Sequence, residues 1–149
     1  MITKLGKQKL EEKILDLQKE LDRTYKERNE AAAEGDLKEN SAYIFMGERA
    51  QVLTTQIEEA KSDSKQSTLI TPPTQTDKIT YGHRVKIRFN NDNREMEVVL
   101  VGKNDAHLKP DWLSSESPLG IALLSKSVSD NITVNEQSVT ILEISIEAL

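Results

Sequence analysis

Two long segments of the chain have small or apolar residues at spacings that alternate between four and three positions. In the first segment these residues are Leu10, Ile14, Leu17 and Leu21. In the second segment they are Met46, Ala50, Leu53, Ile57 and Ala60. This is the spacing of the a and d positions of a coiled coil, so each segment is predicted to be a helix that packs through one narrow face.

The two series are mirror images of each other along the sequence. If the chain folds back at Leu37, Leu21 faces Leu53, Leu17 faces Ile57 and Ile14 faces Ala60. Towards the tip, Ala50, Met46 and Tyr43 face Thr24, Arg28 and Ala31. The simplest structure with this property is an antiparallel coiled-coil hairpin over residues 1–61, with its tip at residues 34–40.

The expected bounds of the two helices follow from the residues that flank the series. Helix one is predicted to begin within residues 1–6 and to end near residue 33, with Gly6 as a weak point because glycine is unfavourable inside helices. Helix two is predicted over residues 37–61. A linker is predicted over residues 62–78, ordered in part through Leu69 and Ile70, because the apolar pattern stops there and Pro72 and Pro73 exclude a helix.

From residue 79 onward the pattern changes from helical to alternating. The predicted strands are residues 83–89, 95–101, 132–134 and 139–146. A turn at residues 90–93 joins the first two strands into a hairpin, and a second turn lies near Asn135 and Glu136. Residues 98–101 are apolar without alternation, which predicts a strand that is covered on both faces.

A short helix is predicted to start at Ser117. Its hydroxyl can cap the first turn, and Pro118 suits the first helical position because its missing N–H has no partner there. The predicted fold class is therefore α+β: an antiparallel coiled-coil hairpin at residues 1–61, followed by a small antiparallel sheet domain with one helix at residues 79–149.

The composition narrows the possible functions. The hydrophobic content is 36% and the aromatic content 4%, which is low for one large core but suits a two-helix arm. The net charge of -5 argues against direct DNA binding as the main activity. The absence of cysteine and of a long apolar run leads us to expect a soluble cytoplasmic protein with no membrane segment.

The acidic tip is the main candidate for chemistry. Gly35 can end helix one, and Asp36 can cap helix two, which is a purely structural role. Alternatively, Asp36 and Glu39 lie three positions apart on one helix face and can share a hard divalent cation. Two carboxylates cannot hold Mg²⁺ tightly, so a partner would have to supply the other ligands.

The rest of the chain shows no self-sufficient active site. His83 and His107 have no third ligand nearby, and the sequence contains neither a Ser-His-Asp arrangement nor a glycine-rich phosphate loop. Trp112 is predicted to be a core or edge anchor. We therefore expect a protein that is not an enzyme by itself.

Two motifs, GDLKENSAY at residues 35–43 and SPLGIALL at residues 117–124, make the chain resemble the bacterial Gre-family transcript-cleavage elongation factors. The resemblance implies an FKBP-like C-terminal domain that docks at the RNA polymerase secondary channel, while the hairpin reaches the catalytic centre. The family's docking motif falls here on Ser117, Pro118 and Gly120.

The resemblance also implies a role for each tip residue. Asp36 and Glu39 would help to hold a Mg²⁺ ion shared with RNA polymerase, next to the nascent RNA 3′ end, and Gly35, Asn40 and Tyr43 would support the tip. No cofactor would be bound by the protein alone, and it would act as a monomer. The factor would thereby stimulate the polymerase's own cleavage of backtracked RNA.

The chain departs from the family pattern at several positions. Ser41-Ala42 stands where the family often has Ala-Glu, Ile121 replaces a lysine, and Ser125 and Ser129 replace glycines. These departures affect the expected docking surface more than the fold. One alternative function is a Gre-like channel binder that inhibits or retunes the polymerase, although the presence of both tip carboxylates favours cleavage. Another is a chaperone or prolyl isomerase, which the small aromatic content of the C-terminal part argues against.

Overall fold

The computed structural model describes residues 1–33 and 41–149. The elements are α1 (Lys4–Ala33), α2 (Ser41–Gln66), β1 (His83–Phe89), β2 (Arg94–Val101), the 3-10 helix η1 (Ala106–Leu108), β3 (Trp112–Ser114), α3 (Pro118–Leu123), β4 (Asn131–Val134) and β5 (Gln137–Ile146). They form two compact units. The hairpin unit is Gln8–Ser67, and the sheet unit is Met1–Lys7 together with Thr68–Leu149.

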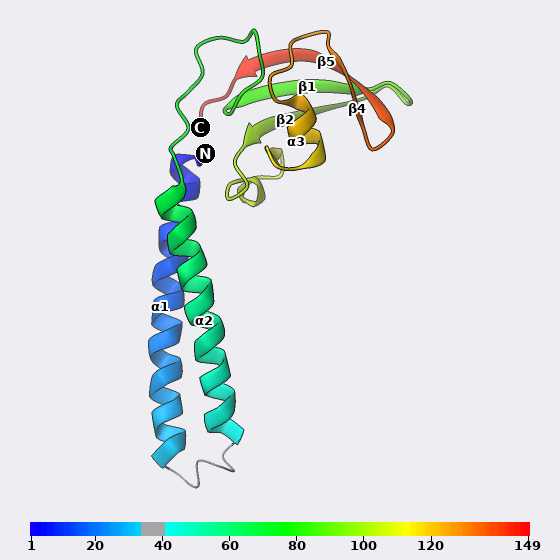
Figure 1. Ribbon diagram of the computed structural model, residues 1–149. Helices are drawn as coiled ribbons and strands as arrows, with labels where there is room; N and C mark the ends of the chain where they lie inside the picture. Colours follow the sequence, from blue (N-terminus) through cyan, green and yellow to red (C-terminus); the bar gives the residue numbers. More distant parts are fainter. Residues whose placement is uncertain (34–40) are drawn as a thin grey trace. The chain divides into compact units, whose positions relative to one another are not determined.

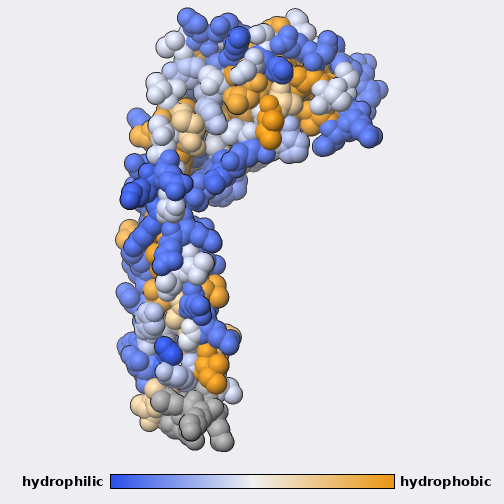
Figure 2. Space-filling view, viewed as in Figure 1, coloured by the Kyte–Doolittle hydropathy of each residue, from blue (hydrophilic) through white to orange (hydrophobic). Residues whose placement is uncertain are grey.

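In the hairpin unit, α1 and α2 lie side by side (Figure 1). The buried residues of α2 are Ala50, Leu53, Ile57 and Ala60. On α1, Leu10 and Thr24 are buried, and the intervening positions Ile14, Leu17 and Leu21 are half-buried. Every position of the predicted series thus lies in the packed seam, which confirms the hairpin interpretation. Outside the seam the surface is mostly hydrophilic, with separate hydrophobic areas on the side shown in Figure 2.

The second helix extends further than predicted. It ends at Gln66, whereas the loss of the apolar pattern placed its end at residue 61. No glycine or proline interrupts residues 61–66, so the helix continues on backbone hydrogen bonds after its apolar face has ended. Ser67 completes the last turn, because both its N–H and its hydroxyl donate to the carbonyl of Asp63. The predicted start of this helix at Leu37 lies outside the described residues.

The strands of the sheet unit are ordered β3-β2-β1-β5-β4. The β1–β2, β1–β5 and β4–β5 pairs are antiparallel, as predicted. The β2–β3 pair is parallel, with Val99 opposite Trp112, so the expectation of a purely antiparallel sheet is wrong. The reason is that β3 has only three residues, too few for alternation to reveal a strand in the sequence.

Apolar residues pack on both faces of β2. On one face, Val98 and Leu100 belong to the main core, together with Leu123 of α3, which lies across the sheet (Figure 1). On the other face, Val99 and Val101 pack with Trp112. This confirms that residues 98–101 are covered on both sides, and it places Trp112 as a buried anchor on an edge strand.

The first residues of the chain are part of the sheet unit. Ile2 is buried and pairs with the segment after α2: its N–H donates to the Thr68 carbonyl at 2.9 Å, and the Ile70 N–H donates to its carbonyl at 2.8 Å. These bonds hold Leu69 and Ile70 in place, as predicted for the ordered part of the linker. Within the described residues, no helix is both long and apolar enough to span a bilayer.

A buried carboxylate fixes the start of α1 within the sheet unit. The amide and the hydroxyl of Thr3 donate to Asp105 at 2.9 and 2.8 Å, and the Gly6 N–H donates to the Thr3 hydroxyl at 2.9 Å. A Cβ at Gly6 would lie 1.6 Å from an Asp105 oxygen. Gly6 therefore allows α1 to lie close to Asp105, and its predicted effect on the stability of the helix start stays a prediction.

Candidate functional site

The hairpin tip separates the two long helices in the sequence. α1 ends at Ala33 and α2 begins at Ser41. The tip residues Gly35, Asp36, Glu39 and Asn40 fall outside the described residues, so their roles remain predictions. Tyr43 is the one predicted tip residue that the structure places.

Tyr43 lies in the seam near the start of α2, where Arg28 of α1 covers its ring. The guanidinium carbon of Arg28 is 4.3 Å from the ring centroid, which is a cation–π contact between the two helices. A Cβ at Gly47 would lie only 3.2 Å from the same guanidinium, so Gly47 leaves room for Arg28. The apolar seam is thus replaced by an aromatic–arginine pair near the tip.

The second predicted motif forms the start of α3. The Ser117 hydroxyl accepts from the Gly120 N–H at 3.1 Å and donates to the Ser114 carbonyl at 2.6 Å, and Pro118 occupies the first turn. This confirms the predicted cap. A Cβ at Gly120 would lie 2.0 Å from the Ser114 carbonyl oxygen, so glycine is required here for packing. Ser117 and Gly120 therefore build the turn, and Pro118 is exposed on it.

The structure shows the surroundings of the residues that depart from the family pattern, Ile121, Ser125 and Ser129. Ile121 is 64% exposed, next to the exposed Pro118 on α3. Ser125 and Ser129 have φ values of 68° and 74°, in the left-handed region that glycine adopts most easily. The backbone thus keeps the shape that suits glycines, although serines occupy both positions.

Arg84 is the centre of a cluster of ion pairs in the sheet unit. Its guanidinium donates to Glu147 at 2.6 Å and to Asp111 at 2.8 Å, and it lies 3.7 Å from Glu97. The bonds to Glu147 and Asp111 raise the pKa of Arg84, and the bond from Arg84 lowers the pKa of the Asp111 carboxyl. The cluster links β1 to the segment before β3 and to the chain end after β5. It stabilises the fold at the surface.

His83 has a structural role. It is fully buried, and its Nδ1 accepts from the Thr80 N–H at 3.0 Å, which leaves Nε2 to donate to the Gln75 carbonyl at 2.7 Å. Both ring nitrogens thus bind backbone groups of the segment that precedes β1. Within residues 1–33 and 41–149, no group of three or more His, Asp or Glu side chains could hold a metal ion.

Comparison with known proteins identifies the family. The model described as the N-terminal domain of transcription elongation factors matches residues 1–65, and the model of the GreA/GreB C-terminal domain matches residues 74–146. The chain belongs to the GreA/GreB family of transcription elongation factors. Its Gre-family resemblance, inferred from the motifs at residues 35–43 and 117–124, is confirmed.

Curated Gre-family relatives match over most of their length. The chain is 33% identical over 135 residues to transcription elongation factor GreA of Maridesulfovibrio salexigens, which covers 90% of this chain and 84% of the relative. It is 36% identical over 127 residues to GreA of Nitratidesulfovibrio vulgaris, covering 80% and 78%. Among solved structures, it is similar to Gfh1 of Thermus thermophilus, with 18% identity, 97% coverage of both chains and a TM-score of 0.44.

Several contacts in this Gre-family chain were not predicted from the sequence. Thr3 and Asp105 are 102 positions apart, and neither residue belongs to a recognisable motif. The Arg28–Tyr43 contact was detectable in principle, because the mirror pattern of the two series brings both residues to the same end of the seam.

Proposed function

We propose that this protein binds RNA polymerase and stimulates the polymerase's own hydrolysis of RNA 3′ ends in backtracked complexes. The observation that supports it most is the combination of a family match over both domains with Asp36 and Glu39 at the hairpin tip. The function is not that of a self-sufficient enzyme, because the two carboxylates need a partner to complete a metal site.

The hairpin suits the delivery of a short acidic segment to a distant centre. α2 has 26 residues, which at about 1.5 Å per residue gives a rod of roughly 39 Å. The seam holds the two helices together through Leu53, which is fully buried, and through the Arg28–Tyr43 contact near the tip. A paired rod of this kind can enter a channel that a globular domain cannot.

The two carboxylates have the donor chemistry that a magnesium ion requires. Carboxylate oxygens are hard ligands, but Asp36 and Glu39 provide only part of an octahedral set. Polymerase side chains and the RNA would provide the rest. A bound Mg²⁺ ion can activate a water molecule or stabilise the leaving oxygen in phosphodiester hydrolysis. Asp36 and Glu39 would contribute charge and position at that centre, and the polymerase would remain the catalyst.

We propose that the sheet unit docks on the polymerase through the exposed residues at the start of α3. Pro118 and Ile121 form an exposed apolar pair there, and Ser117 and Gly120 fix the turn that presents them. The protein would act in the cytoplasm. It would act as a monomer, because one hairpin provides both tip carboxylates.

The test is an RNA cleavage assay on stalled, backtracked elongation complexes. The wild-type protein should shorten the RNA from its 3′ end, whereas Asp36→Asn and Glu39→Gln should still bind polymerase but lose the stimulation. Both amides keep the size of the side chain and remove the charge that the cation needs. Slowed elongation without shortened RNA would instead indicate an inhibitory channel binder. A variant that cleaves like the wild type would refute the role given to that residue.

A further inference from the structure

Arg28 is a charged residue in the packed seam of the hairpin. It continues the series of α1 that contains Leu21 and Thr24, and its side chain is half-buried. Its Nε is buried, and no described residue accepts a hydrogen bond from that nitrogen. None of the ion pairs formed by the described residues includes Arg28. The positive charge is thus partly removed from water without an acidic partner in residues 1–33 and 41–149.

The seam is shaped to accommodate the Arg28 side chain. Its guanidinium carbon lies 4.3 Å from the centre of the Tyr43 ring. A Cβ at Gly47 would lie 3.2 Å from a guanidinium nitrogen and 3.3 Å from the guanidinium carbon, so a larger residue at position 47 would press on Arg28. Glycine is unfavourable in a helix interior, and Gly47 is the seventh residue of α2. The helix therefore has a less stable residue at the place where Arg28 needs room.

The arrangement around Arg28 lowers the stability of the hairpin. A buried donor without an acceptor costs free energy, and so does a glycine inside α2. An apolar residue at position 28 would fill the seam without taking a charge out of water. Features that reduce stability are concentrated at functional positions of proteins. The structure therefore indicates that Arg28 has a role other than stability.

We propose that Arg28 is a positioning residue for the hairpin tip. Its guanidinium, held on the Tyr43 ring, fixes the end of α1 relative to the start of α2. The inference rests on the proposed function, because Asp36 and Glu39 lie between these two helix ends in the sequence. A planar guanidinium on an aromatic ring has a defined geometry, which a pair of aliphatic side chains lacks.

The Arg28–Tyr43 contact is close to both helix ends. Arg28 is five positions before Ala33, which is about 7.5 Å along the axis of α1, and Tyr43 is two positions after Ser41, which is about 3 Å along α2. Carboxylates that complete a metal site on another protein must be placed accurately, since a displacement of about 1 Å can lower a rate by roughly a hundredfold. Loss of the contact should therefore lower the rate of RNA cleavage and leave the affinity for polymerase unchanged.

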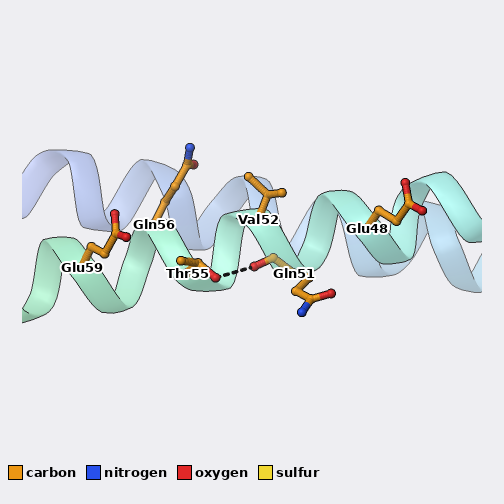
Figure 3. Close-up of a pocket in the computed structure, with 6 residues that line it drawn as sticks. All are labelled: Glu48, Gln51, Val52, Thr55, Gln56 and Glu59. Atoms are coloured by element: carbon orange, nitrogen blue, oxygen red, sulfur yellow. Dashed lines mark hydrogen bonds between the residues drawn. The ribbon is translucent and has the colours of Figure 1, made fainter.

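The test compares variants of the full-length protein. Arg28→Leu replaces the guanidinium by an apolar side chain that suits the seam, Tyr43→Leu removes the ring, and a double variant has both changes. The matched control is Thr24→Val, which also makes a buried polar position of the seam apolar, one turn further from the tip. A second control is Gln56→Ala, in an open depression on α2 (Figure 3).

Three quantities are measured for each protein. These are the melting temperature of the helices by circular dichroism, the dissociation constant for core polymerase, and the RNA cleavage rate at saturating factor. Arg28→Leu should keep or raise the melting temperature, change the dissociation constant by less than about twofold and lower the saturating rate about tenfold. The double variant should be no slower than the slower single variant, because both changes remove the same contact. Both controls should cleave at the wild-type rate.

The outcomes separate this inference from the proposed function. If the wild type cleaves and Arg28→Leu cleaves at the same saturating rate, Arg28 does not position the tip. Weaker polymerase binding with an unchanged saturating rate would assign Arg28 to binding, and a lower melting temperature together with slower cleavage would assign it to hairpin stability. Either result overturns the proposal, as do losses of rate that multiply in the double variant. If the wild type itself does not shorten the RNA, the proposed function is wrong and the inference fails with it.

Discussion

Replacing Ser125 and Ser129 by glycine should stabilise the sheet unit. Both serines adopt left-handed backbone angles, with φ of 68° and 74°. This conformation costs a residue with a Cβ about 1–2 kcal/mol, whereas glycine adopts it freely and loses part of that advantage because its unfolded chain is more flexible. The net gain should be about 0.5–1 kcal/mol for each site. The backbone bonds are retained, since the Ser125 and Ser129 amides donate to the Ile79 and Ile141 carbonyls.

Denaturant unfolding followed by tryptophan fluorescence measures this gain directly. Trp112 is the only tryptophan, and it is buried in the same unit as both serines. The matched control is Ser127→Gly, in the same loop but without a positive φ, which should lower stability slightly. The double variant Ser125→Gly, Ser129→Gly should raise the unfolding free energy by about 1–2 kcal/mol. A loss of stability in both single glycine variants would show that the left-handed backbone is not a source of strain.

Three further predictions concern the fold. Gly120→Ala should destabilise the sheet unit by about 1–3 kcal/mol, because its Cβ would meet the Ser114 carbonyl oxygen at 2.0 Å. The denaturant midpoint of the variant, measured by tryptophan fluorescence, would equal that of the wild type if this contact relaxes freely. Leu53→Ala should cost the hairpin about 2–5 kcal/mol, measured by the loss of helical dichroism on heating, since the side chain is fully buried. Asp111→Asn should lower stability near neutral pH, because Arg84 lowers the pKa of this carboxyl in the folded state. That contribution is present above the ordinary carboxyl pKa and is lost as the pH falls through the lowered one, so the difference between wild type and variant should shrink in acid; a constant difference at all pH values would contradict it.

Periodicity was sufficient to predict the hairpin and most of the sheet. The alternation of four and three placed Leu53 and Ile57 in the seam, and both are buried. The predicted turn at Asn135 and Glu136 lies between β4 and β5, with φ values of 50° and 66° as a tight hairpin turn requires. Such features depend on residues close in sequence, so a local pattern contains the information.

Contacts between distant segments were not predictable in this way. The bonds from Thr3 to Asp105 join residues 102 positions apart, and they make the start of α1 a part of the sheet unit. The parallel pairing of β3 depends on Trp112 lying beside Val99, which no short-range pattern specifies. At the site, the cap by Ser117 followed from local chemistry. The tip roles of Asp36 and Glu39 came from the family resemblance and remain predictions.

Asp36 and Glu39 are proposed to supply ligands for a magnesium ion at the polymerase active centre. The most direct measurement is the rate of RNA cleavage in a stalled complex as a function of Mg²⁺ concentration, with saturating wild-type factor or the Asp36→Asn variant. We expect the wild type to lower the Mg²⁺ concentration needed for half-maximal cleavage, whereas Asp36→Asn should bind the complex and leave that concentration as it is without factor. Equal Mg²⁺ dependence with the wild type and with the variant would contradict the claim.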